Sequence, residues 1–198
     1  MQQTTSLSLP SFVAARLERD SALRTIFVIA AASLILALSA QVAIPLPFSP
    51  IPMTLQPLAV LLLGAALGPV RAGIAALLYL AEGAMGFPVF SQGRGGVAIL
   101  LGPTAGYLYA FPVAAAIAGW AAERGWTKRP HLTVTAMAAA IATIHLGGWS
   151  WLAGPMALGA ERAFAVGVLP FLAGDAVKIA LAAVLLPSAE RIVSRFAR

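Results

Sequence analysis

Cysteine is absent from this 198-residue chain, and charged residues make up only 10% of it against 60% hydrophobic residues. The lack of cysteine excludes disulfides and thiolate metal ligands. Roughly a quarter of the residues of a soluble domain are charged, and here residues 25–70 contain no Asp, Glu, Lys or Arg. Since a membrane-spanning helix takes about 20 apolar residues, the sequence indicates an integral membrane protein. It argues against a soluble enzyme, a secreted disulfide scaffold and a disordered protein.

Six charge-poor apolar windows predict an all-α, polytopic fold with six transmembrane helices, at 25–42, 55–68, 72–83, 104–122, 132–152 and 163–186. Gly68 and Pro69 form a turn that suits two antiparallel helices. The windows do not alternate apolar and polar residues, as the strands of a membrane barrel would. We expect a cytoplasmic N-terminal segment (1–24), a membrane domain (25–187) and a basic cytoplasmic tail (188–198).

The net charge of +6 comes from basic residues that lie between apolar segments and make no continuous face for nucleic acid. With the N-terminus inside, Arg94 and Arg162 fall outside and Lys178 falls within a span, while the other ten of the 13 Lys and Arg residues lie in cytoplasmic segments. Cytoplasmic loops carry the excess of Lys and Arg. We therefore expect both termini to be cytoplasmic.

Two outer connections have unusual compositions. Residues 43–54 contain four prolines and no charge, which predicts a stiff, extended loop. Such a loop is costly against lipid, so we expect it to fold over the protein as a lid. Residues 87–104 carry three glycines around Arg94, which permit close backbone approach. The alternative is that both are ordinary connections.

Asp175 and Lys178 are the most informative charged residues, because they are three positions apart in the middle of the last predicted span and hence on one helix face. Ionisable groups at that depth usually line a cavity or pathway, although a self-neutralising pair is the alternative. Arg94 offers a guanidinium to a carboxylate, or is a solvated loop charge. Glu82 could contact a ligand or pair with Arg94, and we favour a structural role.

Aromatic residues cluster toward the predicted outer side, and the candidate walls of a pocket are Phe48, Tyr79, Phe90 and Tyr107. Some aromatic residues there belong to the interfacial belt of any membrane protein. A pocket with such walls and the charges of Arg94, Asp175 and Lys178, which sum to +1, would complement a ligand with one carboxylate.

Small residues at Ala30, Ser33, Ala37 and Ala40 fall on one face of the first predicted span. Such stripes let helices approach closely, either within the subunit or against a partner. We treat this stripe as a candidate docking face.

No enzyme signature was found. The chain has no Walker sequence, and His131 and His145 lack metal-ligand spacing, so we interpret them as structural hydrogen bonders. We expect no catalytic residue, bound metal or cofactor in this chain.

Four blocks in matching order resemble the BioY family, the biotin-binding S components of energy-coupling factor transporters. They are AQVAIPLPFSPIPMTLQPLAVLLLGAALGP (40–69), LLYLAEGAMGFPVFSQGRGG (77–96), LLGPTAGYLYAF (100–111) and GDAVKIALAAVLLP (174–187). The chain departs from the family at Pro57, where Thr is usual, and at Glu82, where an apolar residue is usual.

The resemblance implies a six-helix biotin-binding subunit of the bacterial cytoplasmic membrane, with its site on the outer side. Its partners would be a transmembrane coupling protein and cytoplasmic ATPases that supply the ATP sites. Arg94, Asp175 and Lys178 match ligand-binding positions of the family. We assign Asp175 and Lys178 to the ureido ring and leave Arg94 open to either end of biotin. The alternatives are a carrier for another small anionic vitamin, and an intramembrane enzyme or structural subunit.

Overall fold

The computed structural model of the chain describes residues 10–11 and 22–196, although not the side chains of residues 189–196. Most of the expected N-terminal segment 1–24 therefore lies outside the described residues. The described part is mostly helical, which confirms the prediction of an all-α fold.

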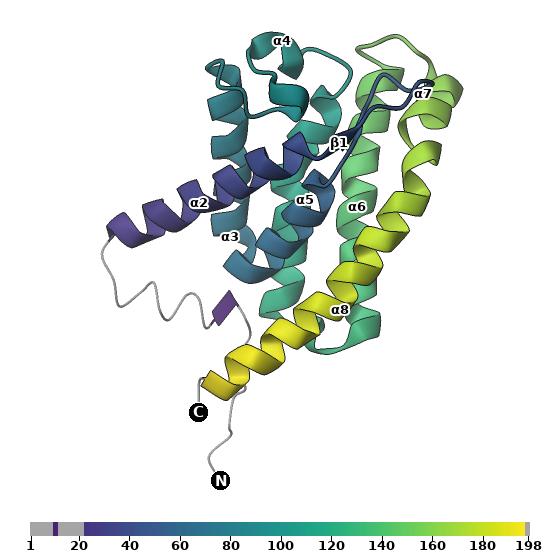
Figure 1. Cartoon of the computed structure of the whole chain (residues 1–198). Coiled ribbons are helices and arrows are strands. Elements are labelled where there is room, and N and C mark those ends of the chain that lie inside the picture. Colours follow the sequence, from purple (N-terminus) through teal and green to yellow (C-terminus); the bar gives the residue numbers. More distant parts are fainter. Residues whose placement is uncertain (1–9, 12–21, 197–198) are drawn as a thin grey trace.

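The long helices form one bundle that α2 and α8 cross obliquely, and most of the short elements lie at one end of it (Figure 1). They are α2 (Ala22–Gln41), α3 (Gln56–Ala84), α5 (Ala105–Glu123), α6 (Pro130–Ala153) and α8 (Leu172–Phe196). The short helices are α4 (Val97–Leu100), α7 (Ala160–Gly167), η1 (Ser91–Gly93), η2 (Trp126–Lys128) and η3 (Leu169–Phe171). Strands β1 (Ala43–Ile44) and β2 (Met53–Thr54) pair antiparallel, so they close the proline-rich loop into a hairpin.

The described residues contain five helices long and apolar enough to cross a membrane, where we expected six. The difference arises because the second and third expected spans belong to one 29-residue element, α3. Gly68 interrupts this element with φ 81° and ψ 172°, a conformation that glycine adopts without a Cβ penalty. The two parts of α3 run in different directions on either side of it (Figure 1), so the chain turns where the sequence predicted a turn.

The last expected span, 163–186, is not a single helix. The structure divides residues 163–186 among α7, η3 and α8, and α8 then continues past the expected start of the tail at 188 to Phe196. Asp175 consequently lies in the first turn of α8, where we expected it in the middle of a helix.

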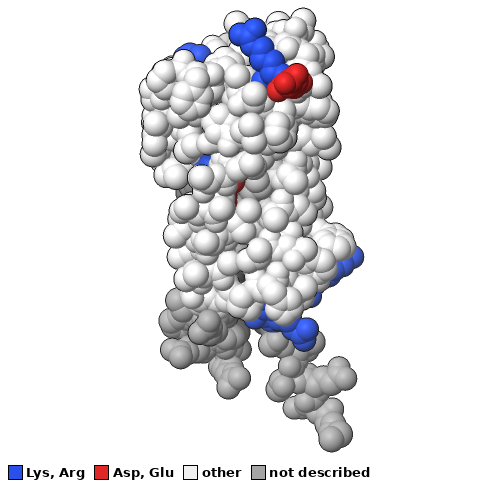
Figure 2. Space-filling view, turned by 90° about the vertical axis from the view of Figure 1, so that its right-hand side faces the viewer, with Lys and Arg blue, Asp and Glu red and all other residues white. Residues whose placement is uncertain are grey.

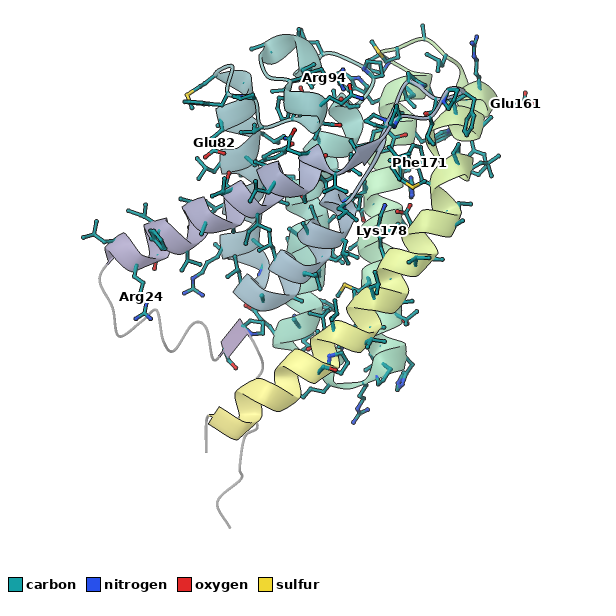
Figure 3. The ribbon with its side chains drawn as sticks, viewed as in Figure 1. Arg24, Glu82, Arg94, Glu161, Phe171 and Lys178 are labelled. Carbon is teal, nitrogen blue, oxygen red and sulfur yellow. The ribbon has the colours of Figure 1, made fainter. Side chains whose placement is uncertain are left out.

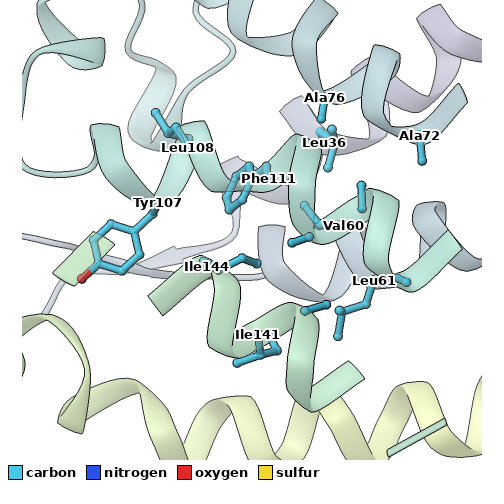
Figure 4. Close-up of a cluster of buried hydrophobic side chains, with 14 of the residues drawn as sticks. Leu36, Val60, Leu61, Ala72, Ala76, Tyr107, Leu108, Phe111, Ile141 and Ile144 are labelled. Atoms are coloured by element: carbon cyan, nitrogen blue, oxygen red, sulfur yellow. The ribbon is translucent and has the colours of Figure 1, made fainter. Parts of the chain in front are cut away.

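Close contacts between small residues hold the central helices α3, α5 and α6 together. A Cβ placed on Gly64 of α3 would lie 2.5 Å from the carbonyl oxygen of Ala115 in α5, and one on Gly106 of α5 would lie 2.3 Å from the carbonyl oxygen of Gly147 in α6. Membrane helices associate by such packing, since lipid offers no hydrophobic driving force. Buried aliphatic and aromatic side chains fill the remaining space, as Figure 4 shows for Leu36, Val60, Leu61, Ala72, Ala76, Tyr107, Leu108, Phe111, Ile141 and Ile144.

The small-residue stripe of α2 packs within the subunit. Ser33, Ala37 and Ala40 are buried, and of the four predicted docking residues only Ala30 is exposed. The prediction of a docking face is therefore corrected for these three residues. They bring α2 close to the neighbouring helices, which larger side chains would prevent.

Large apolar side chains cover much of the outside of the bundle, among them Leu34, Leu38, Val113, Leu146 and Val184. In the face shown in Figure 2, the middle of the molecule is almost free of charged residues, and Lys and Arg gather toward its ends. This distribution is that of a protein surrounded by lipid.

The two ends of the bundle differ in their loops. Arg124, Lys128 and Arg129 lie at the η2 end, toward which the C-terminal half of α8 runs, and the loops of Arg94 and Arg162 lie at the opposite end with α4 and α7 (Figure 1). The basic residues that we expected in cytoplasmic segments between α5 and α6 thus lie at the opposite end from the two arginines that we expected outside.

Gly64→Ala should destabilise the protein by about 1–3 kcal/mol, because the added methyl group would overlap the backbone of α5. The matched control is Gly73→Ala in the same element, whose Cβ would meet its nearest atom, the Pro112 carbonyl oxygen, at an ordinary 3.7 Å. Thermal unfolding in detergent measures both. Equal unfolding midpoints for the two variants would contradict the packing argument.

Candidate functional site

A cavity opens between α3, α5, α6 and α8, toward the end of the bundle that carries α4 and α7. The proline-rich hairpin loop contributes Ile51 and Pro52 to its wall. Ser49 Oγ fastens that loop to α7 by donating a hydrogen bond to the Val166 carbonyl oxygen at 2.8 Å. The loop thus lies against the site, as the expectation of a lid requires.

Asp175 and Lys178 lie on the wall of this cavity and are only 4% and 6% exposed. Lys178 Nζ donates to Asp175 Oδ1 at 2.9 Å. The position of Asp175 in the first turn of α8 also suits a carboxylate, because the helix N-terminus carries partial positive charge. The predicted pair therefore exists, and it faces a cavity.

His145 is a cavity-lining residue that the sequence analysis treated as a structural hydrogen bonder. Its Nε2 lies 2.6 Å from Asp175 Oδ2, so each carboxylate oxygen of Asp175 has a partner. The histidine lies on α6 and the aspartate on α8, 30 residues apart. No spacing rule links such positions, and only the packing of the two helices brings them together.

Arg94 lies in the glycine-rich loop, above Lys178 in the view of Figure 3. It lines the cavity, is exposed overall, and donates from Nε to the Ser91 carbonyl oxygen at 3.1 Å. No carboxylate among the described residues lies within ion-pair distance of it. The Arg94 guanidinium therefore has donors available for a ligand.

Gln41, the last residue of α2, holds the loop that carries Arg94. Its side-chain oxygen accepts the Gly93 backbone N–H at 2.9 Å, and its amide nitrogen donates to the Phe90 carbonyl oxygen at 3.2 Å. Within the loop, the Phe90 N–H donates to the Arg94 carbonyl oxygen at 2.9 Å. The loop is thus ordered by contacts from another helix as well as by its own glycines.

Glu82 does not reach Arg94. It accepts a hydrogen bond from Ser33 Oγ at 2.5 Å, which joins α3 to α2, and Figure 3 shows it well away from Lys178. This contact fits the structural role favoured for Glu82.

The four predicted aromatic residues lie in three places, and only two of them line the cavity. Phe90 and Tyr107 line the cavity. Tyr79 lies behind Phe90, with ring centroids 5.4 Å apart and an edge-on arrangement, and its hydroxyl accepts a hydrogen bond from Gln56 Nε2 at 2.8 Å. Phe48 is 64% exposed and borders a separate surface hollow with Arg162. Its expected place in the pocket is corrected, since its side chain points out of the hairpin loop.

Several cavity residues were not predicted, and they come from five different segments of the chain: Thr54, Gln56, Ser91, Thr104, His145 and Phe171. Five of these six residues are polar and Phe171 is aromatic, and such residues are common throughout the chain, so their type alone carried no signal. The described residues contain no group of three or more His, Cys, Asp or Glu side chains that could hold a metal ion.

Comparison with known proteins identifies the family. The BioY family profile matches residues 7–195. The probable biotin transporter BioY of Pyrococcus horikoshii is 41% identical over 79% of this chain and 88% of its own length. The biotin transporter BioY of Rhizobium etli is 37% identical over 84% of this chain and 90% of its own.

The fold also matches a solved structure, the 2.1 Å crystal structure of the S-component for biotin from an ECF-type ABC transporter. The TM-score is 0.74 at 23% identity, over 85% of this chain and 92% of that one. At this identity the likeness concerns the fold. With the profile covering nearly the whole sequence and two relatives similar over most of their length, the chain belongs to the BioY family.

Proposed function

We propose that this protein binds biotin in the cavity and is the substrate-binding subunit of a biotin uptake system. The observation that carries the proposal is one cavity with the buried Asp175–Lys178 pair on its wall, an unpaired Arg94 guanidinium in its covering loop, and aromatic residues between. The names of the relatives support it, since they are called biotin transporters.

The ureido ring of biotin suits the Asp175–Lys178 pair. A cyclic urea presents a carbonyl acceptor and two N–H donors, and burial of such groups is costly unless each is hydrogen-bonded. Lys178 Nζ has protons left after its bond to Asp175 Oδ1, and these can donate to the ureido carbonyl. The carboxylate retains lone pairs for an N–H of the ligand.

The valerate carboxylate suits Arg94. Asp175 already balances the charge of Lys178, whereas Arg94 has no carboxylate partner among the described residues. Between these charges the thioether ring would contact apolar walls that include Phe90, Tyr107, Phe111 and Ile144. This arrangement orients the ligand with its ureido ring inward and its carboxylate toward the loop of Arg94.

Transport would follow from binding without covalent chemistry. We infer that partner subunits supply the energy, namely a transmembrane coupling protein and cytoplasmic ATPases, because the sequence lacks a Walker motif. The similar S-component from an ECF-type ABC transporter supports this inference. The cavity end would face outward and the basic η2 end the cytoplasm, with both termini cytoplasmic, in the cytoplasmic membrane of a bacterium.

In this orientation the two parts of α3 on either side of Gly68 would act as separate spans, which restores the expected count of six. The segments 1–24 and 188–198 would lie on the cytoplasmic side.

Isothermal titration of the detergent-purified chain with biotin tests the proposed function, with other small anionic vitamins as competitors. We expect biotin to bind tightly and to the exclusion of the competitors. A well-folded preparation that binds another vitamin in preference to biotin, or binds none, would contradict the assignment.

The double substitution Asp175→Asn/Lys178→Met should lower biotin affinity by roughly 100-fold or more, because it removes two charged hydrogen-bonding groups. It should leave the unfolding midpoint near that of wild type, since no unpaired buried charge remains. Lys178→Met alone should lower the midpoint, as it leaves the buried carboxylate with one partner fewer. Unchanged biotin binding by the double variant would assign the pair a structural role only.

Arg94→Gln should weaken biotin binding roughly 10-fold, the effect of losing one charge-assisted contact at an exposed position. The methyl ester of biotin should bind the variant and the wild type equally, because it lacks the carboxylate. Arg162→Gln is the matched control, an arginine at the same end of the bundle that does not line the cavity. The proposed orientation is wrong if the ester and the free acid lose affinity to the same extent.

A further inference from the structure

Two buried side-chain polar atoms in the described part of the chain have no hydrogen-bond partner, His145 Nδ1 and Ser91 Oγ. Both residues line the cavity. Buried polar atoms in native proteins are almost always partnered. Two such unpartnered atoms on the wall of one cavity indicate that a bound ligand supplies their hydrogen-bond partners.

Two aromatic rings flank the His145 imidazole. Tyr107 lies edge-on to it with ring centroids 6.4 Å apart, and Phe171 is tilted to it by 44° with ring centroids 6.2 Å apart. The Tyr107 hydroxyl is itself anchored, since it donates to the Gly167 carbonyl oxygen at 2.6 Å. The contact with Asp175 and these two rings together orient the imidazole.

The contact with Asp175 sets the protonation of the ring. An ionised carboxylate only accepts hydrogen bonds, so the nitrogen 2.6 Å from Asp175 Oδ2, Nε2, carries the proton. In a neutral imidazole the other nitrogen is then an acceptor. Since Lys178 already balances the charge of Asp175, we take the ring as neutral, and His145 Nδ1 is then a buried acceptor without a donor among the described residues.

The ureido ring supplies a donor that Asp175 cannot satisfy. The two N–H bonds of a cyclic urea point to opposite sides of the ring, so one carboxylate accepts from only one of them. Lys178 provides a donor for the carbonyl between them. The second N–H needs another acceptor on the cavity wall, and His145, which lines the cavity and contacts Asp175 through Nε2, leaves Nδ1 for it.

We propose that His145 is a substrate-contacting and specificity-determining residue whose Nδ1 accepts the second ureido N–H of biotin, with Asp175 accepting the first and Lys178 donating to the carbonyl. The inference rests on the proposed function and extends it, because it assigns a partner to every hydrogen-bonding group of the ureido ring. A ligand with a carboxylate but without paired N–H groups would leave His145 Nδ1 unsatisfied.

Substitutions of His145 separate direct contact from the positioning of Asp175. His145→Gln retains an amide nitrogen near the place of Nε2, so it can still donate to Asp175, but it lacks Nδ1. His145→Leu lacks both nitrogens. We expect both variants to bind biotin roughly 10- to 100-fold more weakly than wild type, the effect of leaving a buried hydrogen-bonding group unmatched.

The matched control is His131→Gln, which changes the same residue type in the same helix at an exposed position far from the cavity. It should bind biotin as wild type does. Unfolding midpoints identify any variant that has lost its fold, and the milder His145→Gln keeps the test valid if His145→Leu does not fold.

Two biotin derivatives, each methylated on one ureido nitrogen, test the contact itself. In wild type each methyl group removes one donor. In His145→Leu, methylation of the nitrogen that faces residue 145 should cost at least 5-fold less affinity than in wild type, on the order of a typical direct coupling. Methylation of the other nitrogen should cost the same in both proteins.

The results distinguish the inference from the function on which it rests. Wild-type affinity in His145→Gln would show that the ring only positions Asp175, and equal methylation costs in wild type and His145→Leu would show no contact; either overturns the inference while biotin binding stands. If the wild-type chain itself fails to bind biotin, the proposed function fails too.

Discussion

Asp175 is a carboxylate buried among apolar helices, and it is tolerated there because Lys178 and His145 each contact one of its oxygens. Replacing such a group by apolar residues is often neutral or stabilising, so stability alone does not explain its presence in a bundle with so few charges. Asp175, Lys178 and His145 come from α6 and α8, and all three face one cavity. A polar contact therefore joins these two helices, and the site is part of what holds them together.

Glycine shapes the rest of the site by giving room to rings. A Cβ on Gly148 would lie 2.1 Å from Tyr107 Cζ, and a Cβ on Gly83 would lie 2.0 Å from Phe90 Cζ. The rings of Tyr107 and Phe90 thus occupy space that is free because the facing residue is a glycine. Small residues therefore have two roles in the bundle. They make room for these aromatic rings, and they let α3, α5 and α6 approach closely. The cavity lies where larger side chains meet.

The sequence alone predicted the helical membrane fold, the turn at Gly68, the Asp175–Lys178 pair and the importance of the loops. These features follow from local rules of hydropathy, glycine conformation and helical spacing. His145 was missed because its partner is 30 residues away on another helix. The stripe of Ser33, Ala37 and Ala40 was assigned to the wrong surface, because periodicity groups residues on a face without showing what that face packs against. Phe48 was misplaced because a position in an outer loop does not show which way the side chain points.

The loop of Arg94 is fastened by Gln41, and Gln41 belongs to α2, the least buried of the five membrane-length helices in the described part of the chain. The fastening therefore depends on how α2 sits in its surroundings of lipid or protein. Gln41 contacts Gly93 and Phe90 in the loop of Arg94, whereas Asp175, Lys178 and His145 are held by α6 and α8. The two ends of the proposed site therefore depend on different helices, and a change in the surroundings of α2 bears directly on the end that carries Arg94.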